Sequence, residues 1–169
     1  MRRFFALALP GAVQAGLGAW MGGPGWRWAE PEGLHLTLAF LGEVPEAAVG
    51  PLETAAREVA TRHRPFELRS AGLGQFPPVG APRVLWLGFE PSEPLDALAG
   101  DLREVLRRAG VAFNPKPFTP HLTLARRGAG VRPGLPLTPP PAVRWPVAAL
   151  SLMSSDQGRY RPTGSWALG

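Results

Sequence analysis

Short apolar runs bounded by glycine and proline alternate along this chain with longer segments in which apolar residues recur every three or four positions. The short runs are typical of buried strands, and the longer spacing is typical of helices that bury one face. Seven strands are predicted, at residues 3–9, 34–42, 66–76, 83–89, 121–126, 147–155 and 158–168.

Three helices are predicted between these strands. The segment 92–110 has the clearest pattern, because its leucines form one apolar stripe, Ser92 can cap its start and Gly110 can end it. The segment 45–62 has apolar residues close to helical spacing. The segment 11–20 follows a proline but is rich in glycine, so we expect its helix to depend on tertiary packing.

Two further segments are predicted to be loops. Residues 23–33 combine glycine, proline and two tryptophans, and residues 128–141 form a long stretch rich in glycine and proline. A loop of that length in a compact domain is often functional or mobile. With 169 residues, of which 45% are apolar, the chain fits a single domain over residues 1–169.

Two of the predicted strands begin with the same tetrapeptide, His-Leu-Thr-Leu, at His35 and at His121. Each follows another strand and a helix, so the order strand, helix, His-strand occurs twice and indicates an internal repeat. Alternation along a strand places the histidine and the threonine on one face and the leucines on the other. If the two units are related by a two-fold axis, then His35, Thr37, His121 and Thr123 line one groove.

Paired histidines on one groove suit general acid–base chemistry, in which one accepts a proton and the other donates one. Threonine hydroxyls beside them can hold an anion, and a phosphodiester matches this set of groups without a metal ion. A single histidine in an apolar strand is more often structural, but packing gives no reason to use His-x-Thr twice. A zinc site is the alternative, although the chain has no cysteine and His63, the third histidine, lies in a charged helical stretch. We expect neither a metal nor a cofactor.

The net charge of +5 favours a polyanionic partner. A non-catalytic RNA-binding module with a basic groove is therefore the alternative to an enzyme. The N-terminal arginines and apolar run also resemble a signal peptide, but Pro10 and Gly11 end that run after six residues. Since no segment approaches the length of a membrane span, we expect a cytoplasmic protein without a membrane partner, and a monomer.

These residues carry a resemblance to a known family. The two motifs, the opening "RRFFALALP", the strand "PRVLWLGFE" and the late "GRYRP" resemble the 2H phosphoesterase superfamily, within it the RNA 2′,3′-cyclic phosphodiesterases, also called 2′-5′ RNA ligases. The resemblance implies a bilobal α+β fold, with two pseudo-symmetric lobes, each an antiparallel sheet with helices on its outer face, and an active groove between them. It also implies hydrolysis of a terminal 2′,3′-cyclic phosphate of RNA to a 2′-phosphate, and in some members reversible 2′-5′ ligation.

The resemblance further assigns roles to residues of the two motifs. It implies that His35 protonates the departing 3′ oxygen, that His121 activates water, and that Thr37 and Thr123 hold the phosphate. Arg126 matches the arginine in the family's "HLTLAR" and either binds phosphate or is a solvated strand-end charge, because strict alternation puts it one step off the catalytic face.

Three residues outside the motif positions are further candidates. Phe40 and Trp86 either stack on a base or, as we expect, pack in the core. Arg103 belongs to an arginine cluster on the polar face of the segment 92–110, where a solvated position is expected.

Overall fold

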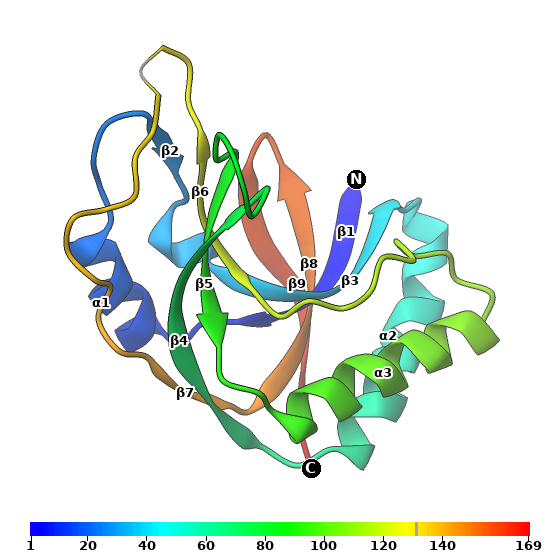
Figure 1. Cartoon of the computed structure of the whole chain (residues 1–169). Helices are drawn as coiled ribbons and strands as arrows, with labels where there is room; N and C mark the ends of the chain where they lie inside the picture. The colour runs from blue at the N-terminus through cyan, green and yellow to red at the C-terminus, as the bar shows by residue number, and fades with distance from the viewer. Residues whose placement is uncertain (131) are drawn as a thin grey trace.

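The computed structural model describes residues 1–130 and 132–169, in which nine strands form one sheet flanked by helices (Figure 1). The strands are β1 (Arg2–Ala8), β2 (Trp26–Trp28), β3 (His35–Glu43), β4 (Phe66–Phe76), β5 (Val84–Phe89), β6 (Leu122–Arg127), β7 (Arg144–Val147), β8 (Ala149–Asp156) and β9 (Arg159–Ala167). The helices are α1 (Gly11–Trp20), α2 (Val49–Arg62) and α3 (Glu93–Arg108), with 3₁₀ turns η1 (Pro31–Gly33) and η2 (Glu46–Ala48).

The sheet is antiparallel and has the order β7-β4-β5-β6-β3-β1-β8-β9, and the short strand β2 pairs with the end of β6 beyond its contact with β3. Its two halves meet where β3 and β6 pair through Leu36 and Leu122. This arrangement confirms the predicted bilobal α+β class. The halves are nevertheless continuous at that junction, because the two motif strands themselves pair with each other.

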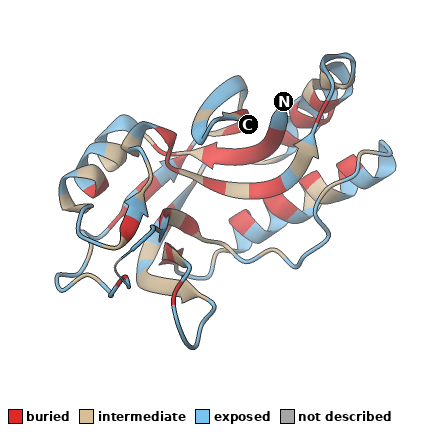
Figure 2. Ribbon diagram, turned by 90° about the horizontal axis from the view of Figure 1, so that it is seen from above, coloured by how far each residue is buried: buried red, intermediate tan, exposed pale blue. Residues whose placement is uncertain are grey.

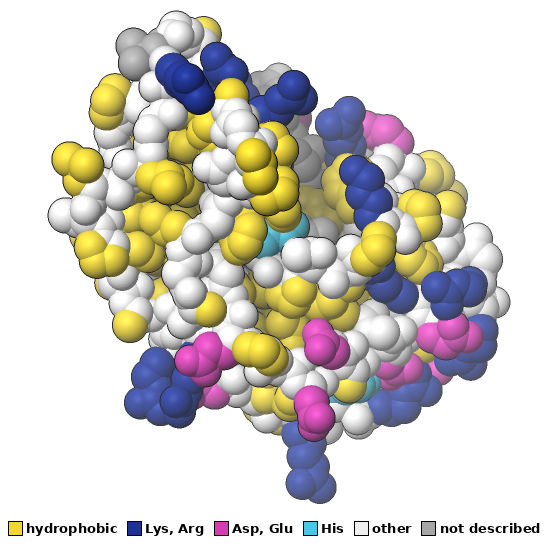
Figure 3. Space-filling view, viewed as in Figure 1, with side chains coloured by type: hydrophobic (Ala, Val, Ile, Leu, Met, Phe, Trp, Pro, Cys, Tyr) yellow, Lys and Arg dark blue, Asp and Glu magenta, His cyan; other side chains and the backbone are white. Residues whose placement is uncertain are grey.

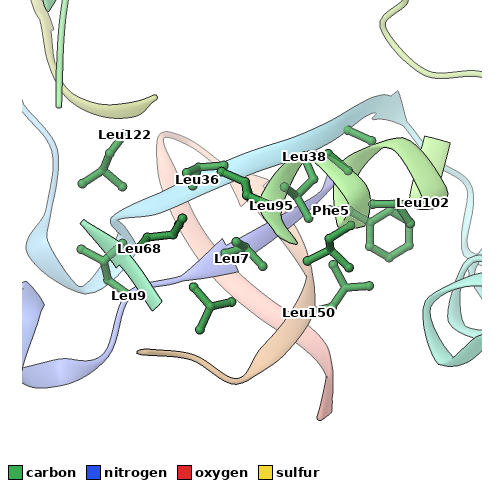
Figure 4. Close-up of a cluster of buried hydrophobic side chains, with 14 of the residues drawn as sticks. Phe5, Leu7, Leu9, Leu36, Leu38, Leu68, Leu95, Leu102, Leu122 and Leu150 are labelled. Atoms are coloured by element: carbon green, nitrogen blue, oxygen red, sulfur yellow. The ribbon is translucent and has the colours of Figure 1, made fainter. Parts of the chain in front are cut away.

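One hydrophobic core serves both halves of the sheet (Figure 4). Leu36 and Leu122 lie in it with Leu7 of β1 and Leu68 of β4, and Leu95 of α3 packs among them. The helices turn one face to this core, whereas the central strands β1 and β8 are buried on both faces (Figure 2). Each fully buried leucine stabilises the fold by about 1.5–3 kcal/mol, so the leucines of both motifs contribute directly to stability.

The three predicted helices are present, with one change in boundary. In α3 the Ser92 hydroxyl accepts a hydrogen bond from the Leu95 amide at 3.2 Å, acidic residues lie in the first turn and arginines in the last. Helix α2 begins at Val49 and not at residue 45, because the residues before it form the 3₁₀ turn η2. Helices α2 and α3 pack against each other, while α1 lies at the opposite side of the molecule (Figure 1).

Two short strands were not predicted. Residues 26–28 of the expected loop 23–33 form β2 beside β6, and residues 144–147 form β7 beside β4. Both lie at edges, and Pro146 within β7 is tolerated because an edge strand leaves one row of amides unpaired. The predicted end of a strand at Gly42 is also wrong, since β3 continues to Glu43.

The expected loop 128–141 has no helix or strand in its described part, and residue 131 lies outside the described residues. Indole N–H groups hold it to the rest of the fold: Trp26 donates to the Gly134 carbonyl at 2.9 Å, and Trp20 donates to the Thr138 carbonyl at 3.2 Å. These contacts give a role to one of the two tryptophans of the segment 23–33. Among the described helices, none has both the length and the apolar character needed to cross a membrane.

Candidate active site

The two His-Leu-Thr-Leu motifs lie side by side at the centre of the sheet. Because Leu36 is directly opposite Leu122 in an antiparallel pair, the register places His35 opposite Thr123 and Thr37 opposite His121. The leucines are buried in the core, whereas the histidines and threonines are half-buried on the other face. The structure therefore brings the four predicted side chains together as a crossed quartet, with each histidine beside the threonine of the other motif.

A cavity of about 600 Å³ opens at one end of this quartet. Figure 3 shows a histidine at the bottom of a hollow with hydrophobic side chains on its walls. The wall combines motif residues with aromatic rings and two cationic side chains, among them Thr37, His121, Phe40, Phe76, Phe118, Arg103 and Lys116. Such a mixture of apolar walls with a few polar groups is typical of small-molecule sites.

Both histidines are oriented in the same way by the backbone two residues upstream. The Nδ1 atom of His35 lies 2.7 Å from the Gly33 carbonyl oxygen, and Nδ1 of His121 lies 2.7 Å from the Thr119 carbonyl oxygen. A carbonyl only accepts hydrogen bonds, so Nδ1 must carry the proton in each case. Nε2 of each ring is then left to accept a proton from a ligand, or to donate one when the ring is charged.

The environment of His35 makes its charged form unfavourable. Its ring lies between Phe4 and Tyr160, with ring centroids at 4.7 and 4.8 Å. Burial is the main cause that lowers the pKa of His35 below its ordinary value, and the charges of His121 and Arg126 lower it further, against the opposing hydrogen bond to Gly33. The two imidazoles are thus close enough to interact, and an anion bound between them would favour protonation of His35.

A β-bulge brings Arg126 onto the same face as the quartet. Along β5 the neighbours Trp86 and Leu85 pair with Thr123 and Ala125, so β6 contains one extra residue. Both Leu124 and Ala125 consequently face the core, and Arg126 faces the groove. The prediction from strict alternation was wrong here, because alternation stops at a bulge.

The first motif has the same bulge at the equivalent position. Phe5 and Ala6 of β1 pair with Ala39 and Thr37 of β3, which leaves one extra residue in β3 and turns Phe40 toward the groove. Phe40 is 41% exposed and lies in the wall of the cavity, so the expectation that it packs in the core was wrong. The two motifs therefore present different side chains at equivalent places, Phe40 in one and Arg126 in the other.

Arg103 of α3 joins the first motif to the segment that leads into the second. Its Nε donates to the Leu38 carbonyl at 3.1 Å, at the bulge of β3, and its Nη1 donates to the Lys116 carbonyl at 2.8 Å. Its guanidinium also lies over the rings of Phe113 and Phe118. The expected solvated position is thus wrong for Arg103, because a helix pattern shows which residues are polar but not which backbone carbonyls they meet.

Trp86 is half-buried and supports His121 from the side. Its ring centroid lies 5.2 Å from that of Phe76 and 6.3 Å from that of His121. The indole lies directly on Gly74 of β4, where a Cβ atom would overlap its six-membered ring. Gly74 therefore provides the space that sets the position of Trp86. The expectation that Trp86 packs in the core was wrong, because it pairs with Thr123 and lies on the groove face of the sheet.

Replacing Gly74 by alanine should destabilise the fold by about 1–3 kcal/mol, because the new methyl group displaces the Trp86 indole. The matched control is Gly100→Ala in α3, where a Cβ meets no atom within 4 Å. That change should stabilise the protein by about 0.5–1 kcal/mol through better helix propensity. Urea titrations give both free energies of unfolding, and equal stability of Gly74→Ala and the unsubstituted protein would contradict the assigned packing.

The described part of the chain contains no group of three histidine, aspartate or glutamate side chains placed to hold a metal ion. His63 lies far from the motifs in sequence and contacts Asp101 through Nε2 at 2.8 Å, between the end of α2 and α3. It is therefore engaged in a contact between helices.

Comparison with known proteins identifies the family. The sequence model of the 2′-5′ RNA ligase superfamily matches residues 19–159, and the chain belongs to this family. This confirms the resemblance found in the paired motifs. A Thermus thermophilus protein named RNA 2′,3′-cyclic phosphodiesterase is 38% identical over 168 residues, which cover 92% of this chain and 82% of that protein.

Two further proteins show how far the similarity extends. A Geobacillus stearothermophilus protein, also named RNA 2′,3′-cyclic phosphodiesterase, is 40% identical over 109 residues, 64% of this chain but only 35% of that protein. The crystal structure of Escherichia coli LigT complexed with 3′-AMP has a TM-score of 0.77 and 32% identity, covering 99% of this chain and 97% of that one. The similarity of fold thus extends over nearly the whole chain.

Proposed function

We propose that this protein hydrolyses the 2′,3′-cyclic phosphate at the end of an RNA to a 2′-phosphate by acid–base catalysis with His35 and His121. The observation that carries the proposal is the crossed quartet, in which two imidazoles, each held through Nδ1 by a backbone carbonyl, and two threonine hydroxyls face one groove. The names of the Thermus and Geobacillus relatives support the same activity.

In the proposed reaction His121 acts as the base and His35 as the acid. Nε2 of His121 removes a proton from water, whose oxygen forms a bond to phosphorus. The bond from phosphorus to the 3′ oxygen breaks, and Nε2 of protonated His35 gives its proton to that oxygen. The product is a 2′-phosphate with a free 3′-hydroxyl, and the hydroxyls of Thr37 and Thr123 hold the non-bridging oxygens while the bonds change.

The cavity beside the quartet supports a nucleotide as the ligand. Phe40, Phe76 and Phe118 give it flat apolar walls on which a base can stack, and Lys116 adds a positive charge. The similar E. coli LigT was crystallised with 3′-AMP, a nucleotide that carries a phosphate on its ribose. The same histidine pair would also serve 2′-5′ ligation, in which an RNA 5′-hydroxyl takes the place of water: its oxygen bonds to phosphorus, the bond to the 3′ oxygen breaks, and the 3′ oxygen receives the proton.

Incubation with 2′,3′-cyclic AMP and with an oligonucleotide ending in a 2′,3′-cyclic phosphate, both in excess EDTA, tests the proposal. We expect turnover of both substrates, because the proposed groups are side chains of the protein. Activity that EDTA removes and zinc restores would contradict the two-histidine mechanism. Complete absence of turnover with retained RNA binding would instead favour the non-catalytic RNA-binding module.

A further inference from the structure

Two arginines face each other across neighbouring strands at the end of the groove. Arg27 of β2 is directly opposite Arg126 of β6, so both side chains leave the sheet on the same side. That side is the face of the quartet, since the bulge in β6 turns Arg126 toward the groove and Trp26, the neighbour of Arg27, is buried on the other side. Figure 3 shows basic side chains at the upper side of the molecule, above the histidine in the hollow.

Like charges directly opposite in an antiparallel pair destabilise a sheet, so this pair requires an explanation. Several other arginines have acidic partners, as Arg3 contacts Glu46 at 2.7 Å and Arg62 contacts Asp101 at 2.7 Å, but these pairs do not stand opposite a second arginine in a sheet. Within residues 1–130 and 132–169, no carboxylate lies within 4.0 Å of Arg27 or of Arg126. Both arginines are also exposed, so their ten guanidinium N–H donors are accessible to a ligand.

The arginine pair lies within reach of a ligand whose reacting phosphate is held between the two histidines. Arg126 lies close enough to His35 for its charge to lower the pKa of that histidine. Along β5 the partners of Thr123 and Arg126 are two residues apart, which corresponds to about 7 Å along the sheet. Arg27 lies one strand further out, about 5 Å beyond Arg126. A second anion of the same ligand can therefore reach the pair while the first stays between the histidines.

We propose that Arg27, together with Arg126, binds the backbone phosphate that precedes the terminal cyclic phosphate of an RNA. The identity of the substrate rests on the function proposed above. An RNA that ends in a 2′,3′-cyclic phosphate continues only in the 5′ direction, so a second anion in the groove must come from the preceding linkage. Arginine is suited to this role, because its planar fork binds phosphate through two hydrogen bonds. The site then binds an oligonucleotide more tightly than a free cyclic nucleotide, because only the oligonucleotide has a preceding phosphate for Arg27 to contact.

The test compares two substrates in one variant. Arg27→Gln should lower kcat/KM by about tenfold for a tetranucleotide ending in a 2′,3′-cyclic phosphate and leave kcat/KM for 2′,3′-cyclic AMP unchanged. The slope of log(kcat/KM) against log[salt] for the tetranucleotide should fall in magnitude by about 0.7, the value for one lost contact to single-stranded nucleic acid. Arg27→Lys should restore part of the loss, since lysine keeps the charge but not the fork.

Arg57→Gln is the matched control, because Arg57 is exposed on α2, which packs on the core side of the sheet. It removes the same charge and should leave both substrates unaffected. Equal losses for the two substrates in Arg27→Gln, or no loss for the tetranucleotide, would overturn the assignment while the proposed hydrolysis stands.

A binding measurement separates this inference from the proposed chemistry. Fluorescence anisotropy with a 5′-labelled tetranucleotide bearing a 2′-phosphate should show a Kd about tenfold higher for Arg27→Gln than for the unsubstituted protein, with or without turnover. An unchanged Kd would overturn the phosphate assignment even in a fully active enzyme.

Discussion

Replacing either His35 or His121 by alanine should lower turnover of a 2′,3′-cyclic phosphate by about 10²- to 10⁴-fold, the usual contribution of a positioned acid or base. Each ring is held by one backbone carbonyl, and neither Nε2 has a hydrogen-bond partner within the described part of the structure. The double variant should be little slower than either single one, because both groups act in the same proton transfer. Steady-state rates with 2′,3′-cyclic AMP measure all three variants.

The third histidine provides the control. His63→Ala removes a contact to Asp101 between α2 and α3, so it should affect stability slightly and turnover hardly at all. Circular dichroism must show that the variants at His35 and His121 remain folded. Full turnover in either single variant would exclude the paired roles.

The rate should also depend steeply on pH, with a maximum between two apparent pKa values and a tenfold loss per pH unit on each side. Those values belong to the pair and not to one residue, because the charge of His121 lowers the pKa of His35. In the free protein burial lowers the pKa of His35, so its proton is lost at a lower pH than usual. A bound phosphodiester is an anion and favours the charged ring, which raises that pKa again.

The difference between the pKa of His35 in the free protein and in the complex gives a specific expectation for the pH profiles of kcat/KM and kcat. The limb of the kcat profile that reports loss of the His35 proton should lie at higher pH than the corresponding limb for kcat/KM, since kcat reports the complex and kcat/KM the free protein. Both profiles are measured in EDTA, and phosphorus NMR identifies the product. A 3′-phosphate would show that the substrate lies the other way round, and a rate that rises with pH without a second limb would contradict the acid–base pair.

The sequence was sufficient to predict the class of fold and the residues that meet in the groove. Alternation in His-Leu-Thr-Leu places Leu36 and Leu122 in the core. This prediction does not require the identity of the neighbouring strand. The direct pairing of the two motifs could not be predicted, because local pattern contains no information on which strands become neighbours. Strands β2 and β7 were missed because tryptophan among glycines and proline within a four-residue run resemble loops.

The bulges show a different limit of sequence reasoning. In "LTLAF" and "LTLAR" an alanine follows a leucine, and both fit the core, so the strand gains a residue without exposing an apolar side chain. Nothing in the spacing distinguishes this from regular alternation. The groove positions of Phe40 and Arg126 therefore appear only when the register with β1 and β5 is known.

The crossed quartet has a consequence for the ancestry of the molecule. Each imidazole stands beside the hydroxyl of the other motif, so a chain with one copy of the tetrapeptide would contain only half of the quartet. Two such chains would complete it by joining their motif strands antiparallel about a two-fold axis, as symmetric homodimers do. Fusion of the two copies would free each to change alone. Phe40 in one motif and Arg126 at the equivalent place in the other are the kind of asymmetry that a homodimer cannot acquire.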